Sequence, residues 1–456
     1  MNVKALGIFL GTLRVGVLFQ YVMADAVVAN RFVADEAFAA MNYAPTVSLS
    51  MLAENAGEQR ALWANFRASI FNGQSSTQNG WLLPAFFQNL LPEGVFRDHV
   101  AALRQCDPKD HFEMIAACGK DLPGNVYAWP LDLSRDELAK YVTQNAEALE
   151  MTVTAEPMED GVSLSGVQPK LAVIKAGDRY VGRTKWDDTH IIAKLPVVGQ
   201  PRLPELEELS LRLAGAVGVS VVEAYLEPLE KLAVEHGYDL GEADAETRFL
   251  AVVRYDRTPE GRVHCEDFAQ VLAVPPEQKY LGASYLDIAL AMMAFPSLGE
   301  PAVHELLRRL VVNEMLGNPD CHLKNIGVYY PDGATPELPP AYDIVGYAAY
   351  NRRVGHGMHI LPPAEMKKPR MSVAAAQQSN AAKPGLSPAV IREFCARLGI
   401  PEKPAATVIR QCVAAAYETW PVMIATSLLT DSQKQKLLTH FEAHSMIASL
   451  AKRRHP

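Results

Sequence analysis

Closely spaced cysteine pairs, long apolar runs and an excess of basic residues are all missing from this 456-residue sequence. Its six cysteines are scattered, with no Cys-x-x-Cys pair, which argues against a disulfide framework or a zinc ribbon and favours a reducing, cytoplasmic setting. No stretch reaches about 18 uninterrupted apolar residues, so no membrane span is expected. The net charge of −9 argues against a general nucleic-acid-binding surface, which would be basic.

The N-terminal residues allow two interpretations. Lys4, an apolar run and the small residues near Ala24–Ala26 have some likeness to a secretory signal. However, Arg14 interrupts the run, and GIFLGTLRVGVLF is better explained as two short strands around a tight turn. We therefore expect a β-hairpin at the start of the chain.

Changes in pattern along the chain predict three domains. A mixed module is expected over 1–150, because the polar and acidic residues of 143–160 mark a boundary. Residues 151–262 contain several strand-like runs, among them RFLAVVRYDRT, where an adenine could hydrogen-bond to the backbone. Residues 263–456 are mainly helical in pattern.

The stretch Gly317–Tyr330, GNPDCHLKNIGVYY, is the most informative part of the sequence. A helix is predicted before it, because apolar residues recur at helical spacing over 302–316. The Gly-Asn-Pro triplet then ends the helix, since proline disfavours the helical conformation in the residue before it. Asp320 follows at once, Asn325 lies five residues later, and the chain then becomes apolar and strand-like.

A carboxylate and a carboxamide at this spacing suit phosphoryl transfer, in which the protein mainly positions groups and neutralises charge. Asp320 can accept a hydroxyl proton, and the Asn325 side-chain oxygen can ligate Mg²⁺. Asp343 in PPAYDIVGY lies a strand later, where a second metal ligand is expected. Taken alone, Asp-x₄-Asn is a weak motif, because a polar helix-ending loop and an unrelated turn aspartate give the same letters.

Histidine is not expected to hold a metal here. His356 and His359 in GHGMHILPP are interpreted as residues of a solvated loop. The adjacent Asp320, Cys321 and His322 are discounted as a metal-binding trio, because neighbouring residues rarely converge on one ion.

The stretch Ser165–Lys170 carries groups suited to phosphate. It lies between two strand-like runs, 162–164 and 171–174. Such a strand–turn–strand could lay backbone N–H groups and the Lys170 ammonium over phosphates. An ordinary hairpin with a surface lysine is the alternative.

A lysine strand followed by an acidic helix is a second phosphate-binding layout. THIIAKLP is a predicted strand ending in Lys194, and Pro204 opens a helix bearing Glu205, Glu207 and Glu208. A glutamate on such a helix can hold a phosphate-binding lysine in place. The alternative is an exposed acidic first turn, which the helix dipole favours in any case.

Together these segments resemble the HipA family of bacterial toxin serine/threonine kinases across nearly the whole chain. The matching blocks are FFQNLLPEG, GKDLPGNV, SLSGVQPK, THIIAKLP, VVRYDRT, GNPDCHLKN and AYDIV, and they occur in the family's order. The resemblance implies an α+β, protein-kinase-like bilobed fold with a β-rich N-lobe, a mostly helical C-lobe and an extra N-terminal subdomain.

The resemblance also implies roles for individual residues. Asp320 and Lys324 match catalytic positions, and Asn325 and Asp343 match metal ligands. Glu207 is the glutamate that pairs with the phosphate-contacting lysine. The implied cofactors are ATP and Mg, and the implied cofactor-binding residues are Ser165, Gly166, Gln168, Lys170, Lys194, Glu207, Val253, Tyr255, Asp256 and His322.

In the family, a serine of the phosphate loop is autophosphorylated to switch the kinase off. Ser163 aligns best with that serine, and Ser165 is a second candidate. A phosphoserine adds roughly two negative charges and could draw the loop away from ATP. Two positions depart from the family pattern: Ala193 lengthens the lysine motif by one residue, and Gly346 stands where a small hydroxyl residue is common.

Three function hypotheses follow. The first is an Mg-ATP-dependent kinase acting on a protein, with an aminoacyl-tRNA synthetase as the target that the resemblance suggests. The second is a non-enzymatic module that joins a helix-turn-helix antitoxin on operator DNA, against which the intact Asp320, Asn325, Asp343 and Lys194 argue. The third is a small-molecule phosphotransferase, which the blocks of the first module do not favour.

Overall fold

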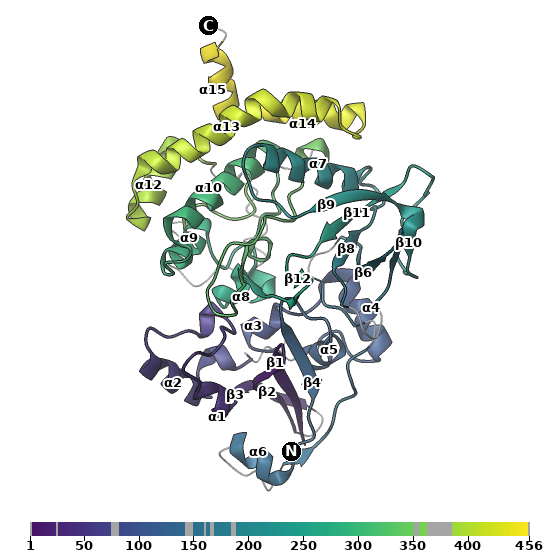
Figure 1. Ribbon diagram of the computed structural model, residues 1–456, viewed down its shortest axis with the longest axis vertical. Coiled ribbons are helices and arrows are strands. Elements are labelled where there is room, and N and C mark those ends of the chain that lie inside the picture. The colour runs from purple at the N-terminus through teal and green to yellow at the C-terminus, as the bar shows by residue number, and fades with distance from the viewer. Residues whose placement is uncertain are drawn as a thin grey trace. The chain divides into compact units, whose positions relative to one another are not determined.

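The computed structural model describes residues 2–23, 26–73, 82–141, 149–158, 161–164, 168–183, 188–350, 355–362 and 385–454. The chain forms two units (Figure 1), of which the first contains residues 1–190, 256–276 and 329–335 and the second contains residues 191–255, 277–328 and 336–456. The division into domains at 150 and 262 stays a prediction.

An antiparallel sheet in the order β3-β2-β1-β4 begins the first unit, and β5 joins β1 in parallel. The predicted N-terminal hairpin is confirmed: β1 and β2 pair with Leu6 opposite Leu18, and Gly11 makes the turn at φ +59°. Glycine reaches this left-handed region without steric cost. The strands are β1 (Asn2–Leu10), β2 (Leu13–Met23), β3 (Ala26–Ala34), β4 (Val126–Pro130) and β5 (Glu150–Met151).

Apolar residues cover both faces of this sheet, which explains why β1 is almost continuously apolar. Leu6 and Ile8 face one buried cluster, whereas Val3 and Ala5 face another, as the alternation of a strand requires. The first cluster includes residues of α1, α2, α3, α4 and α5, and the second includes residues of α6. These helices are α1 (Glu36–Ala39), α2 (Ala56–Ala64), α3 (Ala85–Gln88), α4 (Gly94–Arg104), α5 (His111–Ala117) and α6 (Arg135–Tyr141).

The predicted strand at 162–164 is wrong. Val162 makes only an isolated parallel bridge with Asp121, and the Ser163 N–H donates to the Asp121 carbonyl at 3.0 Å. The Glu93 N–H likewise donates to the Leu164 carbonyl at 3.3 Å. The backbone of this run is therefore bonded to the N-terminal module, and the predicted second strand, β6 (Lys170–Ala176), forms its hairpin with β7 (Arg179–Val181).

The remaining part of the first unit contains short elements around buried charges. Arg257 donates to Asp121 at 2.8 Å and to Asp256 at 2.7 Å, so that residues far apart in the sequence are held by one guanidinium. Such a buried network is stable only when its partners are hydrogen-bonded. The elements are β12 (Arg257–Thr258), β13 (Gly261–Arg262), β14 (His264–Asp267) and α8 (Phe268–Val271).

In the second unit, three antiparallel strands lie in the order β8-β11-β9, and α7 packs on β11 (Figure 1). The strands are β8 (Ile191–Lys194), β9 (Ala224–Pro228) and β11 (Arg248–Val253); the short β10 (Leu232–Ala233) follows β9 in the chain. The helices include α7 (Leu203–Ala216), α9 (Tyr285–Met293), α10 (Gly299–Leu316), α12 (Pro388–Leu398), α13 (Glu402–Ala425), α14 (Asp431–Ala443) and α15 (Ser445–Arg454).

Helix α10 is the centre of the helical part, because α9, α13 and α14 all pack against it. The Trp420 indole N–H donates to the Leu213 carbonyl at 2.9 Å and joins α13 to α7. The helix predicted before the Asp-x₄-Asn motif and the strand predicted after it are confirmed as α10 and β15 (Gly327–Tyr330). Within the described ranges, no helix combines the length and the apolar character needed to cross a bilayer.

We expect the stability of the first unit to depend on the protonation of Glu266. Its carboxylate accepts from Ser48 at 2.6 Å, from the Leu49 N–H at 2.8 Å and from Tyr330. Burial raises the pKa of Glu266 from 4.5 to about 7, although these hydrogen bonds lower it. The folded state thus binds this proton more tightly than the unfolded state, and the free energy of unfolding should fall as pH rises through that interval.

Glu266→Gln removes the titration. When the pH is raised from 5 to 8, the free energy of unfolding of the wild type should fall by up to about 3 kcal/mol more than that of the variant. Urea unfolding measures both. Glu113→Gln is the matched control: burial raises the pKa of Glu113, but bonds from Lys4 and Thr154 bring it below its usual value. Glu113→Gln should therefore change the free energy of unfolding by the same amount at both pH values. An equal pH dependence of wild type and Glu266→Gln would contradict the prediction.

Candidate functional site

The end of α10 sets the start of the Asp320 loop, by which we mean Gly317–Asn325. Gly317 adopts φ +61° and ends the helix in the left-handed conformation. Asn318 then bonds in two directions: its side chain donates to Asn313 at 2.7 Å and accepts from the Asp320 N–H at 3.0 Å. The backbone of Asp320 is thereby tied to the buried helix.

Asp320 and Asn325 are held together within this loop. The Asn325 Nδ2 donates to the Asp320 carbonyl at 2.8 Å, across the short 3₁₀ turn η6 (Leu323–Asn325). The hydrogen bond orients the amide and leaves Oδ1 as the oxygen that a metal would use. The Asp320 side chain is 43% exposed, so a substrate hydroxyl can reach it.

Lys194 joins three elements of the second unit. Its ammonium lies 2.5 Å from the Glu207 carboxylate of α7 and also contacts Asp343. The ladder between β8 and β11 is regular, with Lys194 opposite Leu250, so the extra Ala193 is accommodated without a bulge. The predicted pairing with Glu207 is present in the structure, whereas the phosphate-contacting role of the lysine stays a prediction.

Electrostatics keep Lys194 charged. Its side chain is 7% exposed and that of Glu207 is 1% exposed, so both groups are desolvated. Burial alone would lower the pKa of Lys194, but the carboxylates of Asp343 and Glu207 raise it above its usual value. Two anions around one cation also hold the site in one arrangement until another charge competes for the ammonium.

Asp343 has an unusual backbone. Its φ is +54°, a left-handed conformation in which Asp is tolerated better than most side chains. The preceding Tyr342 stacks on Tyr255 with ring centroids 5.7 Å apart, and its hydroxyl donates to the Lys324 carbonyl at 3.2 Å. Tyr342 therefore links the Asp343 backbone to the Asp320 loop, while Lys194 contacts its carboxylate.

Gly346 is explained by a neighbouring hydroxyl. Its N–H donates to Ser210 Oγ of α7 at 2.9 Å, and a Cβ at Gly346 would lie 3.3 Å from that oxygen and from Leu437. The small hydroxyl residue that the resemblance leads one to expect here would be crowded. A hydroxyl group is still present beside this position, contributed by α7.

The other predicted site residues are distributed over both units. In the second unit, Val253 ends β11 with its N–H bonded to the Glu223 carbonyl at 2.9 Å, and His322 Nε2 lies 3.9 Å from Asp320. In the first unit, Asp256 accepts from the Gly124 N–H at 2.8 Å. Ser163, Gln168 and Lys170 also belong to that unit, whereas Ser165 and Gly166 lie outside the described residues.

Sequence reasoning missed the supporting residues. Tyr280 donates to the Asp320 carboxylate, and Tyr342 and Ser210 make the contacts given above. None of these has a local signal, because each meets its partner from a distant part of the sequence. Asn318 did have one, since an asparagine before proline and aspartate is typical of a side-chain-capped turn.

The donors present fit a hard cation held by few protein ligands. Throughout the described part of the chain, no three His, Cys, Asp or Glu side chains are grouped as a metal would require. The predicted magnesium ligands, Asn325 and Asp343, supply one amide and one carboxylate oxygen. Mg²⁺ is commonly held by one or two such groups together with substrate phosphates and water.

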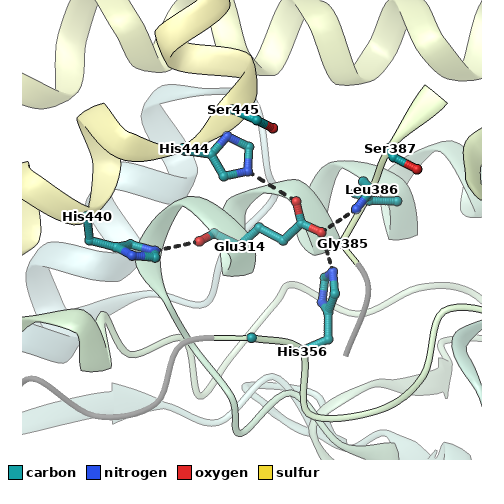
Figure 2. A pocket seen from close by; sticks show the side chains of 9 residues that line it. Glu314, His356, Gly385, Leu386, Ser387, His440, His444 and Ser445 are labelled. Carbon is teal, nitrogen blue, oxygen red and sulfur yellow. Dashed lines mark hydrogen bonds and ion pairs between the residues drawn. The ribbon is translucent and has the colours of Figure 1, made fainter. Parts of the chain in front are cut away.

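A pocket of 310 Å³ surrounds Glu314, three residues before the Asp320 loop (Figure 2). Its carboxylate accepts from His356 at 2.5 Å, from His444 at 3.1 Å and from the Leu386 N–H at 2.6 Å. Burial would raise the pKa of Glu314, but these bonds hold it at about 2. The expectation of a solvated His356 is therefore wrong: its side chain is buried against Glu314, whose largely buried carboxylate needs hydrogen-bond donors.

Two family models match separate parts of the chain. A family model for the HipA N-terminal domain matches residues 6–128, and one for the HipA-like C-terminal domain matches residues 162–420. Two Sinorhizobium fredii proteins named as candidate kinases, Y4dM and Y4mE, are 36% and 29% identical over 272 and 286 residues. These matches cover 59% and 58% of this chain and span 63% and 64% of the relatives' lengths.

A solved structure extends the likeness to the whole fold. A chain in the Shewanella oneidensis MR-1 complex of HipA, HipB and operator DNA superposes with a TM-score of 0.62, covering 96% of both chains at 19% identity. This likeness confirms the predicted fold class, α+β and protein-kinase-like.

Removing the shared ammonium should destabilise the second unit. Lys194→Met leaves two carboxylates facing each other without their cation, and breaking a buried pair costs about 3–5 kcal/mol. Arg397→Met, which breaks an exposed pair with Glu393, should cost less than about 1 kcal/mol. Adding Glu207→Leu to Lys194→Met should recover part of the loss. Urea unfolding measures the free energy of unfolding of all three variants. Equal decreases for Lys194→Met and Arg397→Met would contradict the prediction.

Proposed function

Because the chain belongs to the HipA family, we propose that it is an ATP-dependent serine/threonine protein kinase of toxin type. The observation that carries the proposal is the arrangement within the second unit. Lys194 contacts both Glu207 and Asp343, Tyr342 ties the residue before Asp343 to the Asp320 loop, and Asn325 is bonded to Asp320. These are the groups that phosphoryl transfer needs, and all of them belong to the second unit.

Asp320 acts on the substrate hydroxyl. Its exposed carboxylate accepts the proton as the hydroxyl oxygen bonds to the γ-phosphorus and the bond from that phosphorus to the β–γ bridging oxygen breaks, which releases ADP. Lys324 belongs to the same loop and is the second catalytic residue of the proposal. The hydrogen bond from Asn325 to the Asp320 carbonyl keeps the base and the metal ligand in a constant relation.

Asn325 and Asp343 would hold the magnesium ion, which would neutralise charge on the phosphates. The Lys194 ammonium would then donate to phosphate oxygens as well. Glu207, almost fully buried, keeps the ammonium at the end of β8 throughout. The two carboxylates alone would repel the phosphates. The Lys194 ammonium between them offsets part of that repulsion.

Backbone groups of the segment Val253–Asp256 would hydrogen-bond to the adenine, apart from the Val253 N–H, which is bonded to the Glu223 carbonyl. Tyr255 is kept in place by stacking on Tyr342, which precedes the metal ligand Asp343. His322 belongs to the Asp320 loop and keeps its proposed nucleotide-binding role there. The proposal gives a phosphate-binding role, as a separate inference, to Ser165, Gly166, Gln168 and Lys170. The support for these last residues is the match of SLSGVQPK to the family pattern.

Autophosphorylation at Ser163 or Ser165 would inactivate the enzyme. Ser163 is buried, its hydroxyl donates to the Leu90 carbonyl and its N–H donates to the Asp121 carbonyl. A phosphate group on Ser163 cannot keep the first of these bonds and brings roughly two negative charges to a buried position near the Asp121 backbone. Modification there would expel 161–164 from the N-terminal module.

The partners follow from the family and are part of the proposal. A chain of similar fold occurs in a complex with HipB and operator DNA, so a helix-turn-helix antitoxin, and DNA through it, is the expected partner of this chain. The substrate is a serine or threonine of a cytoplasmic protein, with an aminoacyl-tRNA synthetase as the first candidate.

Intact mass after incubation with Mg-ATP tests the activity. The wild type should gain one or two phosphoryl groups, located by fragmentation at Ser163 or Ser165, and Asp320→Ala should gain none. The physical reason is that Asp320 supplies the exposed carboxylate of the loop, and its backbone carbonyl accepts from the predicted metal ligand Asn325.

A second variant controls for the loss of an aspartate outside the site. Asp332→Ala removes an exposed carboxylate that accepts hydrogen bonds from Ala334 and Thr335 within its own turn, so labelling should persist. Phosphate found on a metabolite but not on protein would favour the small-molecule phosphotransferase instead. Nucleotide binding without any transfer would favour the non-enzymatic antitoxin-binding module.

A further inference from the structure

Tyr280 contacts the Asp320 loop although nothing in the motifs points to it. It lies between the short 3₁₀ turn η5 (Pro276–Gln278) and α9, forty residues before Asp320. Its hydroxyl donates to Oδ1 of Asp320. The ring meets His322 edge-on, with centroids 4.8 Å apart and planes at 84°. One side chain thus touches the carboxylate and a second residue of the same loop.

The backbone beside Tyr280 is also bound to the loop. The Leu323 N–H donates to the Lys279 carbonyl at 3.2 Å. The segment 279–280 therefore contacts the loop at Asp320, at His322 and at Leu323. Because these contacts come from backbone, ring and hydroxyl together, the tyrosine has little freedom to leave the carboxylate.

The hydroxyl controls a degree of freedom that the backbone leaves open. The bond between the Asp320 N–H and Asn318 orients the main chain. Rotation of an aspartate carboxylate about its last torsion is broad and roughly two-fold, so backbone contacts do not fix it. A phenol donor on one oxygen does fix it, and a bond to a charged acceptor is stronger than one between neutral groups.

We propose that Tyr280 is a positioning residue that holds Oδ1 of Asp320 and so presents Oδ2 to the substrate hydroxyl. This inference rests on the proposed kinase function. Tyr280 itself touches neither substrate nor nucleotide in this account and takes no proton. The two carboxylate oxygens have separate partners, and the hydroxyl that is to be phosphorylated meets a base already in its reactive orientation.

Tyr280→Phe removes the hydroxyl and keeps the ring on His322. Orientation matters in the transition state more than in nucleotide binding. We therefore expect kcat to fall about tenfold, with KM for ATP changed by less than about twofold and the melting temperature nearly unchanged.

Tyr285→Phe is the matched control. The Tyr285 hydroxyl donates to the carbonyl of Cys321, the next residue of the loop, at 2.5 Å. This variant also loses a phenol hydrogen bond to the loop, but the acceptor is backbone. Its kcat should stay within about threefold of the wild type. Its melting temperature should fall more than that of Tyr280→Phe, because the lost hydroxyl leaves a buried carbonyl without its donor. Equal losses of kcat in the two variants would show a general loosening of the loop and overturn the proposal.

A spectroscopic measurement does not depend on activity. In protein labelled with ¹³C at tyrosine Cζ, Tyr280→Phe identifies the Tyr280 signal. Asp320→Ala should move that signal towards the position of free tyrosine and leave the Tyr285 signal in place. A Tyr280 signal that ignores Asp320→Ala would overturn the contact itself. Absence of phosphoryl transfer in the wild type would instead overturn the proposed function, and the NMR result would still decide whether Tyr280 holds Asp320.

Discussion

The second unit depends on one buried ammonium group. Lys194 ends a strand, Glu207 lies in the second turn of the helix that follows, and Asp343 comes from a loop 149 residues later. Placing two carboxylates this close without a cation would be strongly unfavourable, and a lone buried lysine would lose its charge. Each group therefore requires the others, and the strand, the helix and the loop take up their places together.

Side-chain hydrogen bonds extend this order to the Asp320 loop. Asn318 and Asn325 bond to the backbone of Asp320, and Tyr342 reaches the Lys324 carbonyl from the residue beside Asp343. The loop contains no long regular element, so its backbone groups have to find partners elsewhere. Those partners are polar side chains. Their positions are determined by α10 and by the contacts of Lys194 with Glu207 and Asp343. Precision at the loop is thus a property of its surroundings.

Patterns close in sequence were predictable, and contacts between distant residues were not. The hairpin around Gly11, helix α10 with its stop at Gly317, and the pairing of Lys194 with a glutamate of α7 all follow from local periodicity, turn chemistry or a family motif. The strand expected at 162–164 fails because its backbone bonds to Asp121 and Glu93, which local pattern cannot reveal.

The same limit explains the site residues that were missed. Nothing near Tyr280 or Ser210 in the sequence indicates that these hydroxyls meet Asp320 and Gly346. His356 was expected in a solvated loop, yet it is hydrogen-bonded to the buried carboxylate of Glu314 on another element. A sequence pattern predicts which local structure a segment can form. The hydrogen bonds of its polar side chains depend instead on which buried groups of other segments need partners.

Glu314 has a consequence for how the molecule opens. Its side chain gathers bonds from His356, His444 and the Leu386 N–H, and its carbonyl accepts from His440 at 2.9 Å. Helix α14, near the end of the chain, is therefore joined to the last turn of α10, which leads into the Asp320 loop. Segments joined in this way exchange their amide hydrogens in one cooperative opening. A ligand that reduces the motion of the Asp320 loop should accordingly slow deuterium uptake in α14, more than a hundred residues further along the chain. It should do so without contacting α14.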